Sequence, residues 1–181
     1  MDKGYIHVYT GNGKGKTTAA LGVALRTLAN GYNVAVAQFI KSRGFDYSEL
    51  KAFNYINSLD GPLGKIKIDQ FGTGCCLHGR KPSDEDFRII EEGFNKAEEW
   101  INSGQYELVI LDEINVAIHL GLIQPQKVIE LLSHKPAHVE IIITGRHAIP
   151  EIIEMADLVT EMKEIKHYYT KGVQSRKGID F

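Results

Sequence analysis

The sequence lacks several features that would set it apart from ordinary globular proteins. Its 181 residues include two cysteines and one tryptophan, and no apolar run approaches the roughly 18 residues that a membrane-spanning helix requires. We therefore expect neither a disulfide framework nor a membrane span. Basic and acidic residues number 21 and 23, which leaves a net charge of −2. That balance provides no global basic field for a nucleic-acid backbone.

The two cysteines and the first residues predict a reducing, cytoplasmic environment. Cys75 and Cys76 are adjacent, and a disulfide between neighbouring residues is geometrically unfavourable. The N-terminus runs into an alternating segment without an apolar targeting region. The length and the ordinary share of hydrophobic residues predict one folded domain over residues 1–181, of which 164–181 form a polar C-terminal tail.

Strand and helix patterns alternate along the chain, which favours a mainly parallel sheet with helices on both faces. In such a sheet, ligands bind where the strands end. Residues 40–65 carry no pattern clear enough to assign. We expect strands at 5–9, 33–39, 66–71, 106–111 and 138–144, an edge strand at 158–162, and helices at 17–30, 84–103 and 150–155, with two short helices before 138.

A glycine-rich segment, GNGKGKTT, lies between the first predicted strand and the first predicted helix, as a phosphate-binding loop requires. Its glycines let backbone amides converge on phosphate oxygens, and the helix N-terminus adds partial positive charge. Lys16 adds a full charge, and the Thr17 hydroxyl can bind magnesium. This pattern predicts an α/β fold like that of P-loop NTPases. The predicted nucleotide-binding residues of the loop are Gly11, Asn12, Gly13, Lys14, Gly15, Lys16, Thr17 and Thr18.

One position of the loop departs from the common pattern. Thr10 stands where the first glycine is usual, and Gly11 comes one place later. A cradle of altered shape can hold a triphosphate in a different direction. We therefore expect the chemistry to lie away from the γ-phosphorus.

The apolar run 108–111 ends in Asp112 and Glu113. Phosphate-loop enzymes bring a carboxylate to their metal ion in this way. We predict that Thr17, Asp112 and Glu113 bind magnesium. An Asp that only caps the following helix is the alternative interpretation.

Two basic residues follow predicted strands at the expected ligand edge. Lys41 comes after the second strand and Arg146 after the strand 138–144. Each can contact phosphate or a second substrate, and we include both among the candidate binding residues. A surface ion pair is the alternative for each of them.

A zinc site is the less favoured interpretation of Cys75, Cys76 and His78. These residues lack a normal ligand spacing and a fourth ligand. A turn of small residues explains the segment better, because Gly72 and Gly74 can supply unusual backbone angles.

Taken together, the motifs are more specific than any one of them alone. The segments TGNGKGKTTAA, QFIK, LVILDEIN, IIITGR, ADLVTEM and KHYYTKGVQSRKGIDF resemble the phosphate-loop ATP:cob(I)alamin adenosyltransferases, also called corrinoid adenosyltransferases. The resemblance extends over about residues 5–181. The glycine loop and LDE recur in many NTPases, whereas GNGKGKTTAA together with the GIDF ending is far more restrictive.

The resemblance implies a reaction in which cobalt(I) of a reduced corrinoid attacks the ribose 5′ carbon of ATP. Adenosylcobalamin or adenosylcobinamide forms and triphosphate leaves. The resemblance also implies that the nucleotide binds in the reverse sense, so that the loop holds the leaving group. Lys16, Thr17 and Glu113 would then be the catalytic residues, with Mg²⁺ neutralising triphosphate charge. It further implies an electron donor such as a flavodoxin, and a homodimer. The charge balance and the short apolar runs lead us to expect no nucleic-acid or membrane partner.

The chain departs from its relatives in two places. Relatives often carry aromatic residues just after the glycine that corresponds to Gly74, where these pack against the corrin, but this chain has Cys75, Cys76 and Leu77. Phe71, Leu77 or Phe39 substitutes for them in our hypothesis. The charged N-terminal arm of many relatives is almost absent here, so a partner subunit or the tail 164–181 would close the site instead.

Two other functions share parts of this pattern. A conventional kinase or ATPase would use the same loop and acids but release ADP or phosphate, and the displaced first glycine speaks against it. A non-catalytic nucleotide sensor or corrinoid carrier would bind without turnover.

Overall fold

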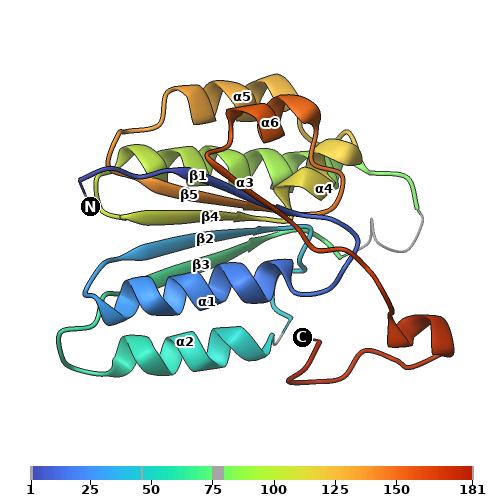
Figure 1. Cartoon of the computed structure of the whole chain (residues 1–181), viewed down its shortest axis with the longest axis horizontal. Coiled ribbons are helices and arrows are strands. Elements are labelled where there is room, and N and C mark those ends of the chain that lie inside the picture. The colour runs from blue at the N-terminus through green and yellow to red at the C-terminus, as the bar shows by residue number, and fades with distance from the viewer. Residues whose placement is uncertain (1, 46, 75–79, 181) are drawn as a thin grey trace.

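The computed structural model describes residues 2–45, 47–74 and 80–180. Their centre is one sheet of six strands, every adjacent pair of which is parallel (Figure 1). The spatial order is β3-β2-β4-β5-β1-β6. The strands are β1 Ile6–Thr10, β2 Val34–Phe39, β3 Ile66–Phe71, β4 Leu108–Asp112, β5 Glu140–Thr144 and β6 Leu158–Glu161.

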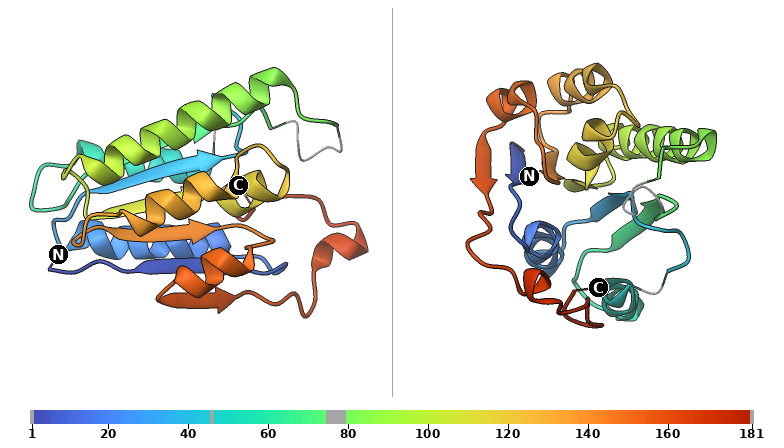
Figure 2. Two further views of the ribbon diagram at one scale, coloured as in Figure 1. Left: turned by 90° about the horizontal axis from the view of Figure 1, so that it is seen from above. Right: turned by 90° about the vertical axis from the view of Figure 1, so that its right-hand side faces the viewer.

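Helices cover both faces of the sheet, which confirms the predicted α/β architecture. Figure 2 shows α1 and α2 on one face and the remaining α-helices on the other. None of the described helices is long and apolar enough to cross a membrane. The helices are α1 Lys16–Ala29, α2 Ser48–Ser58, α3 Asp84–Asn102, α4 Ile114–His119, α5 Pro125–Ser133 and α6 Pro150–Met155, with a 3₁₀ turn, η2, at Tyr168–Lys171.

The central strands are apolar on both faces because both faces are covered. All six residues of β2 are buried, and their side chains alternate between two cores. Val36 and Ile110 pack on the α1 side, whereas Ala37 and Leu111 pack on the α3 side. This two-sided burial holds the carboxyl ends of β2 and β4 at a fixed position.

Local sequence signals account for where most elements begin. A capping box opens α3: the Ser83 side chain accepts from the third helical residue, and the Asp86 carboxylate accepts from the Ser83 backbone amide at 2.7 Å. The strand β6 lies at the edge of the sheet, as expected, and its neighbour is β1. The unassigned segment 40–65 contains α2, which buries only Phe53. Its pattern is weak because one buried residue in eleven leaves no apolar stripe to detect.

The C-terminal tail returns to the edge where the strands end. After β6 the chain crosses past the start of α1, and residues 178–180 lie near the start of α2 (Figures 1 and 2). Residues far apart in sequence therefore meet around the carboxyl ends of β1, β2 and β4.

Candidate active site

The phosphate loop connects β1 to α1 and packs against the segment that follows β6. The Gly13 amide donates to the Met162 carbonyl at 2.6 Å, and a Cβ atom built on Gly11 or Gly13 would lie 2.6 Å from that same oxygen. Gly15 has a φ of 114°, in the left-handed region that favours glycine. These glycines are thus required by the loop's own packing as well as by any phosphate.

Lys16 is the first residue of α1 and is held inside the loop. Its ammonium donates to the carbonyls of Gly11 at 2.7 Å and Gly13 at 2.8 Å. Burial lowers the pKa of Lys16, and the nearby carboxylate of Glu113 opposes that shift only in part. The charge is therefore fixed in place before any ligand binds.

Asp112 ends β4 and is fully buried behind the loop. Its Oδ1 accepts from the Thr17 hydroxyl at 2.8 Å and from the Thr144 hydroxyl at 2.7 Å. The residue that precedes α4 is Glu113, and no side chain caps this helix. Asp112 is therefore no helix cap, which removes that alternative, and it orients Thr17.

Glu113 projects from a left-handed backbone, with a φ of 63°, toward the cavity. Its amide donates to the Thr144 hydroxyl at 2.9 Å, so Thr144 links both acids to the end of β5. Burial, and secondarily the charge of Asp112, raises the pKa of Glu113. A cation bound nearby would reduce the free-energy cost of ionising Glu113.

Lys41 follows β2 and reaches the same region. Its ammonium lies 2.8 Å from Glu49 Oε1 and 3.6 Å from Asp112 Oδ2, and 4.8 Å from the centre of the Tyr47 ring. Burial by itself would lower the pKa of Lys41, but Asp112 and Glu49 outweigh it and raise the pKa. Lys41 thus forms an ion pair, but the pair lies in the lining of the site and not on the exposed surface.

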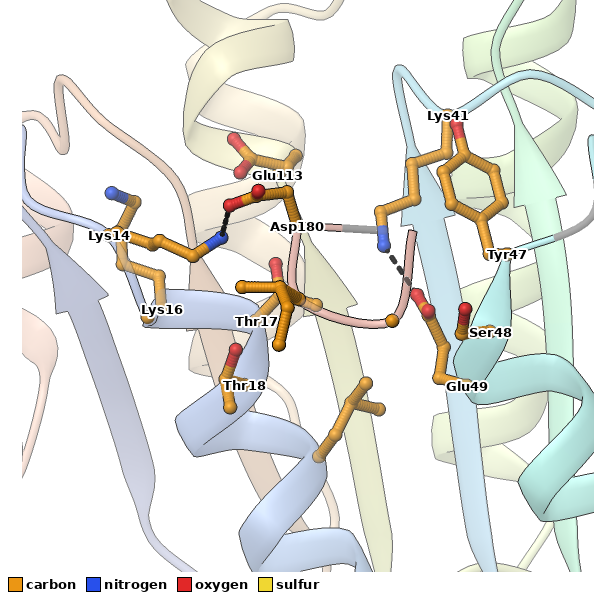
Figure 3. A pocket seen from close by; sticks show the side chains of 14 residues that line it. Lys14, Lys16, Thr17, Thr18, Lys41, Tyr47, Ser48, Glu49, Glu113 and Asp180 are labelled. Atoms are coloured by element: carbon orange, nitrogen blue, oxygen red, sulfur yellow. Dashed lines mark hydrogen bonds and ion pairs between the residues drawn. The ribbon is translucent and has the colours of Figure 1, made fainter. Parts of the chain in front are cut away.

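These side chains surround a cavity of about 480 Å³, shown in Figure 3. A second cavity of about 390 Å³ adjoins it and is lined by Arg146 and the tail. Four residues line both: Lys14, Lys16, Glu113 and Asp180. The two cavities therefore offer adjacent spaces around one cluster of charges.

Asp180 fastens the tail to the loop. Its carboxylate lies 2.7 Å from the Lys14 ammonium, accepts from the Arg176 amide at 2.9 Å, and accepts from the Tyr168 hydroxyl. The hydrogen bond with Lys14, followed by that with Tyr168, holds the pKa of Asp180 well below its usual range. The guanidinium of Arg176 lies over the Tyr168 ring. The tail thus forms one wall of the cavity.

The family model described as "ATP:corrinoid adenosyltransferase BtuR/CobO/CobP" matches residues 2–181. The chain belongs to this family. It is 34% identical to the corrinoid adenosyltransferase of Sinorhizobium sp, over 99% of this chain and 81% of that protein. It is 32% identical to that of Escherichia coli (strain K12), over 99% of this chain and 87% of that protein. The resemblance noted in the sequence is therefore confirmed.

A solved structure of the RadB recombinase shares the fold. Its TM-score is 0.55 at 15% identity, with 92% of this chain and 77% of that chain covered. At this identity the likeness concerns the fold alone.

The structure brings most of the predicted site residues of this adenosyltransferase family member to the two cavities. Asp112 stays behind the wall and acts through Thr17, and Gly11 contributes backbone only. The larger cavity is lined by Lys14, Gly15, Lys16, Thr17, Thr18, Lys41 and Glu113, and the smaller one by Asn12, Gly13 and Arg146.

Sequence reasoning missed Glu49, Thr144 and Asp180. Glu49 lies in the unassigned segment, and Thr144 and Asp180 lie inside motifs whose individual side chains carried no signal.

Two predictions concern the segment after Gly74: the less favoured zinc site, and the residues that would pack against the corrin. Cys75, Cys76, Leu77 and His78 lie outside the residues that the structure describes. Phe39 and Phe71 are buried, with ring centroids 6.2 Å apart, in the core on the α3 side. Their rings therefore contribute to the core.

The donor set suits a hard divalent cation. Thr17, Asp112 and Glu113 offer only oxygen atoms, which magnesium prefers. The Thr17 hydroxyl donates its proton to Asp112, so its lone pairs remain available. Among the described residues, no group of three or more His, Cys, Asp and Glu could hold a metal ion. A magnesium ion here would therefore need the Thr17 hydroxyl and oxygen atoms of a bound substrate as well as carboxylates.

Proposed function

We propose that this protein transfers the 5′-deoxyadenosyl group of ATP to cobalt(I) of a reduced corrinoid, giving adenosylcobalamin or adenosylcobinamide and triphosphate. The observation that carries the proposal is the cluster of Lys14, Lys16, Thr17 and Glu113 around one cavity, in a chain that matches the family model from residue 2 to 181.

The reaction needs no protein nucleophile. The electron pair of cobalt(I) forms the cobalt–carbon bond, the bond between C5′ and its oxygen breaks, and triphosphate leaves with that pair. Lys14 and Lys16 would stabilise the charge that builds on the leaving group, and their position in the lining of the cavity supports this role. Losing one such preorganised donor typically costs about 10²- to 10³-fold in kcat. Rigid strand ends also align the reactants, a contribution of up to about 7 to 11 kcal/mol.

Thr17 and Glu113 would hold Mg²⁺, with Asp112 orienting Thr17 from behind the cavity wall. When bound, the ion neutralises charge on the triphosphate. Thr144 fixes the orientation of both acids through its bonds to Asp112 and to the Glu113 amide. Lys41 and Arg146, at the margins of the two cavities, would bind the nucleotide.

The shape of the loop supports a reversed nucleotide. The Gly13 amide is engaged by the Met162 carbonyl, so it does not point at a phosphate as a loop amide of a kinase would. Together with Thr10 in place of the first glycine, this favours a loop that holds the leaving triphosphate, with the 5′ carbon directed outward.

The proposal also covers how the site is closed, where the protein acts and which partners it has. The tail 164–181 closes the site, which the Asp180–Lys14 ion pair supports. A single domain, a cytoplasmic location, a homodimer and a flavodoxin-like electron donor rest on the sequence and its resemblance.

The test is an anaerobic incubation of the protein with ATP, Mg²⁺ and chemically reduced cobalamin. We expect the cobalt(I) spectrum to be replaced by that of adenosylcobalamin, with one intact triphosphate per product. ADP and phosphate without a cobalt–carbon product would instead identify a conventional kinase or ATPase. Binding of ATP or corrinoid without any product would identify a non-catalytic binding protein.

A further inference from the structure

The Asp180 carboxylate lies where the proposed function places the triphosphate. It lines both cavities, its side chain is 10% exposed, and it lies 2.7 Å from the Lys14 ammonium. Figure 3 shows the two side chains pointing toward each other. Because the proposed function assigns Lys14 to the triphosphate, a phosphate oxygen and this carboxylate compete for the same ammonium.

The carboxylate is also held in place from within the tail. It accepts from the Tyr168 hydroxyl and from the Arg176 amide, the latter at 2.9 Å, and the Arg176 Nε lies 3.5 Å away. Lys14, followed by Tyr168 and the Arg176 amide, holds the pKa of Asp180 well below its usual range, so the group is an anion at neutral pH. The chain thus carries its own anion to the phosphate loop.

The tail has little else to keep it at the cavity. None of residues 164–180 is buried. Among the residues that the structure describes, the pair between Asp180 and Lys14 is the one hydrogen bond or ion pair that joins residues 164–180 to the rest of the chain. Segments with few buried contacts detach at low free-energy cost. A ligand that takes Lys14 therefore removes this attachment.

The charges of the four residues that line both cavities cancel. Lys14 and Lys16 are positive, and Glu113 and Asp180 are negative when ionised. A triphosphate beside both carboxylates would be repelled by them. Displacement of Asp180 instead leaves a net positive charge to bind the triphosphate. Electrostatics therefore favours exchange of one anion for the other over binding of both.

We propose that Asp180 occupies a phosphate subsite as an intramolecular competitor, and that triphosphate displaces it and releases residues 164–180 from the cavity. The inference deepens the proposed function and rests on it. The tail then closes the site before the nucleotide binds and opens it afterwards. Because His167 and Tyr169 of the tail line the smaller cavity, that cavity widens when the nucleotide binds.

Limited trypsin digestion of the full-length protein tests the release, with inorganic tripolyphosphate in EDTA as the probe. Trypsin must take the Arg176 side chain, which in the structure lies over the Tyr168 ring, 4.9 Å from its centre. We expect saturating tripolyphosphate to speed cleavage after Arg176 about three- to fivefold, the change in population that the loss of one partly exposed ion pair allows. Isothermal titration calorimetry measures the binding, and a peptide substrate of trypsin corrects for any effect on the protease itself.

Two variants separate loss of the ion pair from other effects. Asp180→Asn keeps an oxygen that can accept from Tyr168 and Arg176 but loses the charge. It should therefore be cleaved at the faster rate both with and without tripolyphosphate. Asp60→Asn is the matched control, because Asp60 is an exposed carboxylate that follows α2, at the other end of this helix from the tail. It should behave like the wild type.

Slower or unchanged cleavage at saturating tripolyphosphate would overturn the inference, and so would an Asp180→Asn variant that is cleaved at the slow wild-type rate. Absence of tripolyphosphate binding would also overturn it. Failure of the proposed function is seen separately, as absence of adenosylated corrinoid with the wild-type protein.

Discussion

Replacing Thr144 by Val tests whether the end of β5 organises the acids of the site. Val keeps the shape of Thr but has no hydroxyl. Thr144 is fully buried, donates to Asp112 Oδ1 at 2.7 Å and accepts from the Glu113 amide at 2.9 Å. One methyl group in place of the hydroxyl therefore removes two hydrogen bonds at once.

The magnitude follows from these two bonds. A hydrogen bond to a charged group contributes about 1.5 to 3 kcal/mol, and a donor left unsatisfied on burial costs about 1 to 3 kcal/mol. The Glu113 amide is only partly buried, so leaving it unsatisfied should cost about 1 kcal/mol, the low end of the range for a buried donor. We expect Thr144→Val to lower the free energy of unfolding by about 3 kcal/mol. That is a large share of the roughly 5 to 15 kcal/mol typical of a domain.

Urea unfolding followed by circular dichroism measures the loss. With an m-value of about 2 kcal/mol/M, the midpoint should fall by about 1.5 M. Thr160→Val is the control: Thr160 is on the exposed edge strand β6, and its midpoint should move by less than about 0.3 M, since exposed substitutions usually stay within about 0.5 kcal/mol. A Thr144→Val shift as small as that of the control would refute the reasoning.

Three other substitutions test the site. Lys16→Ala should lower kcat by at least about 10²-fold, because the leaving group loses a preorganised charge; near-normal turnover would remove the loop from the chemistry. Glu113→Gln should abolish the magnesium-dependent rate, and its melting temperature should exceed that of the wild type at pH 8 but not at pH 4. The raised pKa of Glu113 means that its ionisation costs stability as pH rises through that pKa; an equal difference at both pH values would contradict this. Asp180→Asn should tighten ATP binding about threefold in a low-salt titration, since Lys14 loses an anion that competes with the triphosphate; weaker binding would show that Asp180 positions Lys14 instead.

The sequence by itself determined the parallel sheet, the phosphate loop and the family. The central strands are continuous apolar runs, the loop glycines stand between a strand and a helix, and the α3 capping box is local. Each of these signals lies within a short stretch of chain, so each is legible without the fold. The positions of Lys16, Thr17 and Glu113 at one cavity followed from strand ends meeting at one edge.

Only the tertiary structure decided which side chains support that site. Asp112 meets Thr144 across 32 residues, and Lys14 meets Asp180 across the length of the chain. Glu49 lies on a helix with a single buried residue, so no periodicity marked it. Such contacts depend on the order of strands in the sheet and on the return of the tail. Long-range packing sets both, and no local pattern encodes them.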